Sequence, residues 1–310
     1  MLQILAAFGA IGQQRGSVID HVLRDAGLPQ QYRIRAVTRD PSSEKAKGLK
    51  AKNIEVIQGD VFDLASLGKA LEGVHTVFLV ATPSSNIDAV AEVEAARNVP
   101  DISLERGVHY LIFSTLPSPS TLSGGKYTKI AMFDAKARAE DYIRNLPIKS
   151  AFYSPGSFMQ NYISFAAPRK ASDGSNAFVM AFHCSPKTRI PLIDAASDTG
   201  KFVEHILANP EEYEGKTVYG AGRTYSLEEM AAIFSKVTKE DVVYSQLSVE
   251  EFKASLPFDA DIITEAYGYY QDFGYYGKDT EALVAAVDKN TSERLTTFEQ
   301  FLVKQNFTLH

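Results

Sequence analysis

The sequence describes a chain of 310 residues, 45% hydrophobic and 23% charged. That supplies enough apolar material for one large core or two fused lobes. The net charge of -6 and the pI near 5.6 argue against nucleic acid as a direct partner, because no basic run concentrates positive charge. No apolar run approaches the roughly 18 residues that cross a bilayer, so we expect no membrane span and no membrane partner.

Cysteine usage and the start of the chain bear on the cellular compartment. The single cysteine, Cys184, cannot form an internal disulfide, and Met1–Leu5 carries no basic region or small-residue cleavage site. We therefore expect a reducing compartment, most simply the cytosol. Cys184 has no convincing histidine partner nearby in the sequence, so we expect a buried or half-buried small side chain rather than a nucleophile. We also expect no metal site.

The first 155 residues alternate apolar runs with amphipathic stretches at the spacing of strands and helices. We predict strands at residues 2–8, 34–38, 54–58, 76–81, 108–115 and 149–154. We predict helices between them at residues 16–26, 42–49, 64–71 and 135–144. This alternation is typical of an α/β fold with a Rossmann-type doubly wound parallel sheet. Residues 1–155 are therefore predicted to form an NAD(P)-binding domain.

After Pro155 the pattern becomes irregular, and we expect a smaller C-terminal α+β lobe for substrate over residues 156–310, interleaved with the first domain. The S-x-x-E patterns at Ser226 and Glu229, and at Ser248 and Glu251, predict the starts of two helices. Residues 267–276 are rich in tyrosine and phenylalanine. These rings either line an apolar substrate pocket or pack on the core.

The first strand runs into the glycine-rich segment GAIGQQRGSV at residues 9–18. A glycine turn between a strand and a helix lets backbone amides and the positive helix end approach a pyrophosphate. An ordinary tight turn is the alternative, but G-x-x-G opens a helix inside a βαβ unit here. We therefore expect this segment to approach the pyrophosphate of a dinucleotide.

Polar residues follow several of the other predicted strands. Arg39 stands where the adenosine ribose lies in such folds, and its guanidinium could fork onto the 2′-phosphate of NADP; a solvated arginine is the alternative. The remaining candidates lie at or just after later strands, at the carboxyl edge where open α/β sheets bind ligands. They are Asp60, Val61, Thr82, Ser114 and Pro155.

Several segments together resemble the NmrA-like family of atypical short-chain dehydrogenase/reductases, which is related to isoflavone-reductase-like enzymes. The segments are Phe8–Gly12, Arg35–Arg39, Gln58–Asp60, Phe113–Ser114, Phe133–Lys136 and Ser154–Asn161. The family includes NADP-sensing regulators and NADPH-dependent reductases, some of them in secondary metabolism. The resemblance implies an NADP(H) cofactor, with glycine-turn contacts from Gly9, Gly12 and Gln14 and a 2′-phosphate contact from Arg39. Gln13, in the same segment, is a further candidate contact.

The resemblance also implies a nicotinamide-side contact from Lys136, which is a catalytic acid/base in the reductase branch. An ammonium there could stabilise an oxyanion or donate a proton. The alternative is a solvated helix-surface pair with Glu140, four residues on. Tyr127 is the second candidate acid. Tyr127 and Ala131 do not form the Y-x-x-x-K pair of typical short-chain dehydrogenases.

Three residues depart from the family pattern: Ile11 replaces the usual threonine, Arg15 the third glycine of G-x-x-G-x-x-G, and Pro100 interrupts a normally continuous helix. Arg15 could swing outward, or it could fill the anion site with its own guanidinium. Ile11 favours the second orientation, because it replaces a hydroxyl with a stiff apolar side chain. We therefore predict that NADP(H) binding is weaker than the family norm.

Three functions follow as hypotheses. The first is an NADPH-dependent oxidoreductase acting on a small apolar or aromatic carbonyl or enone. The second is an NADP(H)-sensing regulatory protein without catalysis, which would bind a protein partner. The third is an isomerase, dehydratase or cyclase that works without nicotinamide on the same scaffold.

Overall fold

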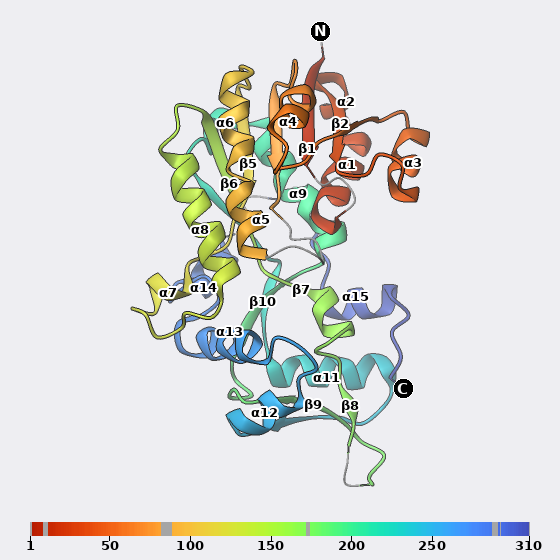
Figure 1. The fold of residues 1–310 in the computed structure, drawn as a ribbon. Helices are drawn as coiled ribbons and strands as arrows, with labels where there is room; N and C mark the ends of the chain where they lie inside the picture. Colours follow the sequence, from red (N-terminus) through yellow and green to blue (C-terminus); the bar gives the residue numbers. More distant parts are fainter. Residues whose placement is uncertain are drawn as a thin grey trace.

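The computed structural model describes residues 2–8, 12–81, 89–171, 174–286, 291 and 293–309. Its first half is built on a seven-stranded sheet in the order β11-β6-β5-β4-β1-β2-β3 (Figure 1). Every pairing in this sheet is parallel. Its strands are β1 (Gln3–Phe8), β2 (Tyr32–Thr38), β3 (Glu55–Gln58), β4 (Thr76–Leu79), β5 (Tyr110–Ser114), β6 (Lys149–Pro155) and β11 (Thr217–Gly220).

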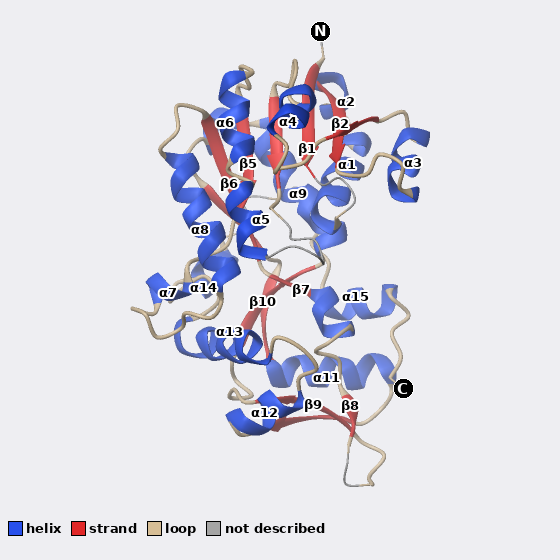
Figure 2. Ribbon diagram, in the orientation of Figure 1, coloured by secondary structure: helices blue, strands red, loops and turns tan. Residues whose placement is uncertain are grey.

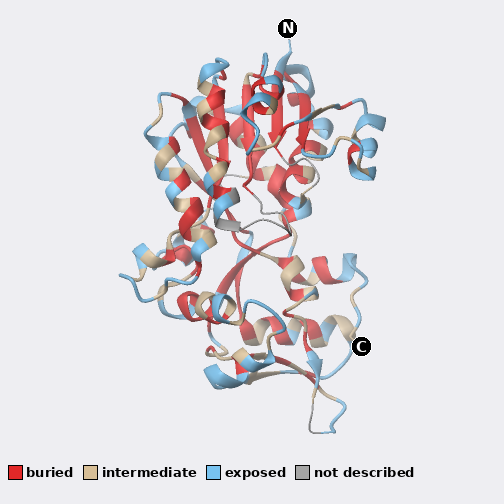
Figure 3. Cartoon of the chain, in the orientation of Figure 1, coloured by how far each residue is buried: buried red, intermediate tan, exposed pale blue. Residues whose placement is uncertain are grey.

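Helices cover both faces of this sheet, because its strands present buried side chains alternately to the two sides. In β1, Leu5 and Ala7 pack with one group of helices, and Ile4 and Ala6 with the other. Figure 3 shows the buried residues following the strands and the helix sides that face them. The first group includes α1 (Gln13–Arg24), α2 (Leu28–Gln31) and α9 (Ala195–Ala208); the second includes α4 (Leu64–Ala70), α5 (Ala89–Ala95), α6 (Asn98–Glu105) and α8 (Ala131–Arg144). Two further helices are α3 (Glu44–Ala51) and α7 (Pro119–Leu122).

Helix α9 comes from the second half of the sequence but packs closely on α1. Gly200 makes this approach possible, since a Cβ there would lie 2.5 Å from the carbonyl oxygen of Ser17. The Gly200 amide donates to the Ser17 hydroxyl at 2.9 Å. His21 and Glu204 form an ion pair beside it. These contacts with α9 therefore hold α1, the helix that begins after Gly12, in place.

The rest of the second half forms two small sheets, in the orders β12-β10-β7 and β13-β9-β8, with helices around them (Figure 2). A separate apolar core holds these elements together. The strands are β7 (Ser157–Phe158), β8 (Arg169–Lys170), β9 (Phe178–Phe182), β10 (Arg189–Ile193), β12 (Arg223–Ser226) and β13 (Val242–Gln246). The helices are η1 (Met159–Ile163), α11 (Leu227–Thr238), α12 (Val249–Ser255), α13 (Ala260–Phe273), α14 (Thr280–Ala285) and α15 (Phe298–Lys304). The short helix α10 (Pro210–Tyr213) instead packs beside α9 and β6, with Tyr213 in the core of the large sheet.

The predicted strands of the first half are confirmed, with ends that differ by one to two residues. Helix α1 begins at Gln13, directly after its N-cap Gly12 and earlier than the predicted residue 16. Both S-x-x-E capping boxes are present, at the starts of α11 and α12. A third box joins Thr297 and Gln300 at α15. It was missed because it uses threonine and glutamine in place of serine and glutamate.

The predicted interruption near Pro100 is present, but the break lies before the proline. Helix α5 ends at Ala95 and α6 begins at Asn98, so Pro100 lies in the first turn of the new helix. A first-turn amide has no partner within its own helix, and proline is tolerated there for that reason.

The aromatic segment 267–276 packs on the core, which is the second of its two predicted arrangements. Tyr267, Tyr269, Tyr270, Tyr275 and Tyr276 are all buried in the second-half core. The hydroxyl of Tyr276 donates to the carbonyl oxygen of Ser154 at 3.1 Å, at the end of β6. These rings therefore join the second-half core to the edge of the large sheet.

Cys184 is a free, buried thiol, as predicted. The prediction overlooked His183, whose Nε2 lies 3.6 Å from the Cys184 sulfur. Burial, together with the charge of Asp272, raises the pKa of the Cys184 thiol to about 12. Burial also lowers the pKa of His183. The thiol therefore stays protonated near neutral pH, and its histidine neighbour does not make it a nucleophile.

Candidate dinucleotide site

The strand order of the large sheet reverses between β1 and β4. The chain proceeds from β1 outward through β2 and β3, then returns to the other side of β1 with β4, β5 and β6. Open α/β sheets bind ligands in the crevice at such a switch point, outside the carboxyl ends of the strands. Helix α1 starts at this point, with Gly12 as an extended N-cap that supplies no side-chain hydrogen bond. Its first-turn amides carry the partial positive charge that favours an anion.

Arg15 points inward across the switch point. Its Nη1 donates to the carbonyl oxygen of Val80, just beyond β4, at 2.8 Å. A Cβ on Gly12 would lie 2.5 Å from Nη2 of Arg15, so the guanidinium rests against the Gly12 backbone. Of the two orientations that the sequence left open for Arg15, the structure has the inward one. Val80 carried no signal in the sequence, because it takes part only through a backbone carbonyl.

Gln14 and Ser114, both predicted as cofactor contacts, lie together. The Ser114 hydroxyl at the end of β5 donates to Oε1 of Gln14 at 2.8 Å, and both residues are buried. This bond joins the first turn of α1 to β5, on the far side of β4. Gln14 is therefore held toward the switch point rather than toward solvent.

Lys136 lies in α8 and is 6% exposed. Burial, and to a lesser extent the charge of Arg15, lowers the pKa of Lys136 to about 8. Glu140 is not its partner, because that carboxylate binds Arg144 in the same helix at 2.6 Å. The alternative of a solvated Lys136–Glu140 pair is therefore wrong. Among the described residues Lys136 forms no hydrogen bond or ion pair.

The other predicted contacts are spread along the same edge. Arg39 is exposed directly after β2, and Gln13 is exposed at the start of α1. Asp60 follows β3, where its carboxylate accepts from the Phe62 amide at 3.0 Å in the turn before α4. Val61, next in the chain, accepts from the Asn98 side chain through its carbonyl oxygen at 2.9 Å.

Pro155 is buried at the end of β6. Gly9, Ile11 and Thr82 lie outside the described residues.

Tyr127 lies against α13 rather than with Lys136. Its hydroxyl donates to Oδ2 of Asp272 at 2.7 Å. Burial and the Asp272 carboxylate raise the pKa of Tyr127 far above its usual range. A phenol that is held by a carboxylate and resists ionisation is a poor general acid. Lys136 is therefore the stronger of the two predicted catalytic candidates.

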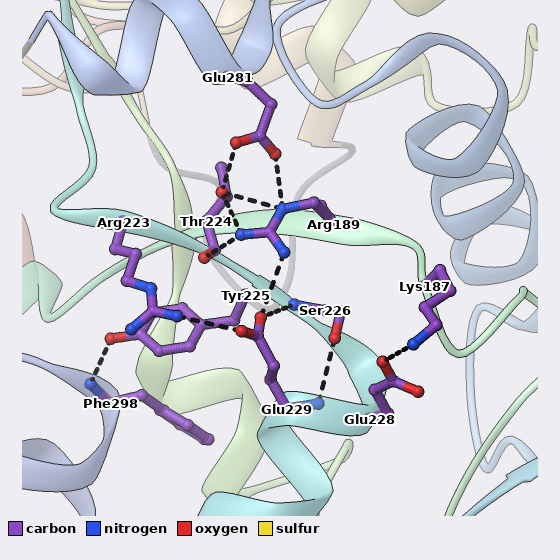
Figure 4. A network of polar contacts seen from close by, with 10 residues as sticks. All are labelled: Lys187, Arg189, Arg223, Thr224, Tyr225, Ser226, Glu228, Glu229, Glu281 and Phe298. Atoms are coloured by element: carbon purple, nitrogen blue, oxygen red, sulfur yellow. Dashed lines mark hydrogen bonds and ion pairs between the residues drawn. The ribbon is translucent and has the colours of Figure 1, made fainter.

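A second polar cluster lies in the other half of the molecule, on β10, β12 and the start of α11 (Figure 4). Arg189 Nη1 and Arg223 Nη2 bind the two oxygens of Glu229, at 3.3 and 3.0 Å. Arg189 also binds Glu281 through Nε at 2.8 Å. Each cation here meets a carboxylate, so the cluster ties β10, β12, α11 and α14 together. No group of three or more His, Cys, Asp or Glu within the described ranges could hold a metal ion.

The geometry of the switch point agrees with the sequence comparison. The sequence matches the NmrA-like family over residues 1–302. The chain belongs to the NmrA-like family. An NmrA-like family domain-containing protein of Dictyostelium discoideum is 30% identical over 315 residues, which span 100% of both chains.

Other NmrA-like proteins include enzymes and a regulator. The NmrA-like family domain-containing oxidoreductase FrzB of a Cladobotryum species is 27% identical over 271 residues, covering 79% of this chain and 76% of the relative. NmrA itself, a negative transcriptional regulator solved in complex with NADP, superimposes with a TM-score of 0.78 at 20% identity. The two structures share 97% of this chain and 94% of NmrA. At that identity the likeness establishes the Rossmann-type α/β fold.

No helix within the described part of the chain has the length and hydropathy needed to cross a membrane.

Proposed function

We propose that this NmrA-like protein is an NADP(H)-dependent oxidoreductase that reduces a small apolar or aromatic carbonyl or enone, with Lys136 as the proton donor. The observation that carries the proposal is the buried Lys136 ammonium near the switch point, with its pKa lowered to about 8. A buried ionisable group with a strongly shifted pKa, placed at a ligand-binding edge, is characteristic of catalytic sites. The oxidoreductases among the relatives support the same reading.

Lys136 has the properties that a general acid needs near neutral pH. With a pKa of about 8 it is mostly protonated at pH 7, and it gives up its proton more readily than an exposed lysine. Burial also strengthens its attraction for a developing oxyanion. When bound, the nicotinamide would supply the hydride. Lys136 would stabilise the resulting charge and deliver the proton.

The residues along the edge fit a phosphorylated dinucleotide once one side chain moves. The α1 N-terminus would hold the pyrophosphate, and the exposed Arg39 after β2 would bind the 2′-phosphate. Arg15 now rests on Gly12, where the backbone must be open for a phosphate to approach. We infer that the dinucleotide binds only when Arg15 leaves Val80, which weakens the affinity.

The inward Arg15 also favours a second candidate, an isomerase, dehydratase or cyclase that works without nicotinamide. In that case Arg15 would fill the phosphate position permanently, and Lys136 would act as an acid/base on a substrate in the same crevice. An NADP(H) sensor without catalysis differs from both candidates, since it binds the dinucleotide and leaves it unchanged.

The test combines NADPH binding with NADPH consumption. The natural protein and Lys136→Met are titrated with NADPH, then assayed for its oxidation with aromatic aldehydes, quinones and enones. The proposal expects both proteins to bind and only the natural one to turn over at a substantial rate. Binding without turnover on any of these acceptors would favour the sensor. Absence of binding, even after Arg15→Gly, would overturn the proposal and favour the nicotinamide-independent enzyme.

A further inference from the structure

A cavity lies in the second half of the molecule. The elements around it, which include β8, β9 and α12, lie at the end opposite the seven-stranded sheet (Figure 1). The cavity has a volume of about 340 Å³, within the range of small-molecule sites. It lies beside the sheet β13-β9-β8, α12, the start of α13 and the segment after η1. Its lining is mainly apolar and includes Phe165, Val179, Phe182, Phe252, Leu256 and Ile263. Neither Arg15 nor Lys136 lines it, so it is separate from the dinucleotide site.

The register of the small sheet β13-β9-β8 explains why the side chains of the protein leave this space unfilled. In β9, the buried Phe178 and Met180 alternate with the partly exposed Val179 and Ala181, which line the cavity. Ser245 of β13 pairs with Ala181 and also lines the cavity. Side chains opposite one another in register share a face of the sheet. On this face β9 and β13 therefore carry the small side chains of Val179, Ala181 and Ser245. Of the large core-facing side chains of β9, only Phe182 at the strand end also lines the cavity.

The same register places a cation on the cavity face. Arg169 of β8 stands opposite Val179, and both line the cavity together with Lys170. Arg169 donates from Nη1 to the carbonyl oxygen of Ser255 at 3.1 Å, at the end of α12. This contact uses one of the five guanidinium donors and orients the group. Among the described residues, neither Arg169 nor Lys170 forms an ion pair, and no aspartate or glutamate lines the cavity.

From this combination we infer that the cavity binds a small amphipathic carboxylate. Its alkyl chain or ring would occupy the apolar interior, and its carboxylate would meet Arg169 and Lys170 at the rim. A planar guanidinium that is already oriented suits bidentate binding of a carboxylate. The cavity volume of about 340 Å³ is at the lower end of the range for small-molecule sites, so the ligand must be small. The ligand is therefore a medium-chain or single-ring acid.

The test is a calorimetric titration of the full chain with octanoate and, separately, with 1-octanol. The two probes share one alkyl chain and differ in charge. We expect one site that binds octanoate at least tenfold more tightly than octanol. Equal binding of the two probes, or no binding of octanoate, would overturn the inference.

Variants locate the site. Ala181→Leu fills the cavity without altering the core face, and Ser245→Leu does the same from β13, which provides a second filling variant if the first folds poorly. Arg169→Gln combined with Lys170→Gln removes the rim charge. Each change should weaken octanoate binding tenfold or more, while Arg24→Gln, an exposed charge removal on α1, leaves it unchanged. Octanoate binding that survives both the filling and the charge variants would place the acid elsewhere and refute the assignment.

Discussion

The basic residues Arg189 and Arg223 differ from Lys136 in the charged groups that surround them. Arg189 and Arg223 meet the carboxylates of Glu229 and Glu281 on the rim of the second-half core (Figure 4). Lys136 is more deeply buried and has no carboxylate partner among the described residues; the charge it senses is that of Arg15. A buried, unpaired charge costs several kcal/mol and persists where a ligand or a reaction needs it. Arg189 and Arg223 therefore hold the fold together, whereas Lys136 is the cation that we propose acts on a ligand.

The largest expected effect comes from Lys136→Met, which keeps the length of the side chain and removes its charge. Loss of a general acid typically costs about a hundredfold or more in turnover. Turnover of the natural protein should also fall as the pH rises through about 8, because Lys136 then loses its proton. A turnover assay across pH measures both effects. Unchanged turnover in Lys136→Met would reduce this lysine to a structural residue.

The same variant should be more stable than the natural protein. An ordinary lysine has a pKa of 10.5, so a folded-state value of about 8 means that folding disfavours the charged form. At about 1.4 kcal/mol per pKa unit, removing the charge should raise the free energy of unfolding by roughly 3 kcal/mol at pH 7. The stability of the natural protein should rise between pH 8 and 10.5, where only the unfolded chain still binds this proton. Urea denaturation checks both, and a destabilised Lys136→Met would contradict the assignment of an unpaired buried charge.

Arg15→Gly should raise NADPH affinity by about tenfold, since it frees the Gly12 backbone and restores the usual third glycine. Arg15→Lys is the matched control, because it keeps a positive charge without the guanidinium that contacts Val80. Isothermal titration of all three proteins measures the affinities. Tight binding by the natural protein, unimproved in Arg15→Gly, would show that Arg15 does not obstruct the site.

The smallest effect is expected at the paired cluster. The Glu229 carboxylate accepts a hydrogen bond from the Ser226 amide at 2.7 Å. This bond makes the largest contribution to lowering the pKa of Glu229, and the charges of Arg189 and Arg223 lower it further. Glu229→Gln should destabilise the protein by about 1 kcal/mol, in line with a weakened helix cap. The charge contribution is present above pH 4.5 and is lost as the pH falls through the lowered folded value.

NADPH affinity should not change in Glu229→Gln. A urea titration and a binding titration together test this pair of expectations. If the variant lost NADPH affinity while remaining folded, the division between structural and ligand-binding cations would fail.

Most of the large sheet could be predicted from the sequence, because each strand is a short apolar run bounded by turn residues. The exception is β11 at Thr217–Gly220, which joins the sheet beside β6 from far along the chain. Four residues with mixed burial carry little periodic signal, and their pairing depends on tertiary packing. Strands β7 and β8 of the small sheets escaped prediction for the same reason, since they have two residues each.

The candidate site was predictable as a set of positions but not as a set of contacts. The glycine-rich segment indicated where the helix after β1 begins, and strand ends indicated Arg39 and Ser114. The Gln14–Ser114 bond spans 100 residues, and the Arg15 contact ends on the backbone of Val80. Such contacts depend on strand order and rotamers, which local sequence does not encode. Burial of Lys136 likewise follows from how α8 packs on the sheet.

The most direct test of the account is a calorimetric comparison of NADPH and NADH on the natural protein and on Arg39→Ala. Arg39 is exposed at the end of β2, and a charge-assisted bond to the 2′-phosphate should favour NADPH by about tenfold or more. Arg39→Ala should erase that preference by weakening NADPH alone. Equal affinities for the two dinucleotides in the natural protein, or a preference that survives Arg39→Ala, would contradict the assignment of this sheet edge as an NADP(H) site.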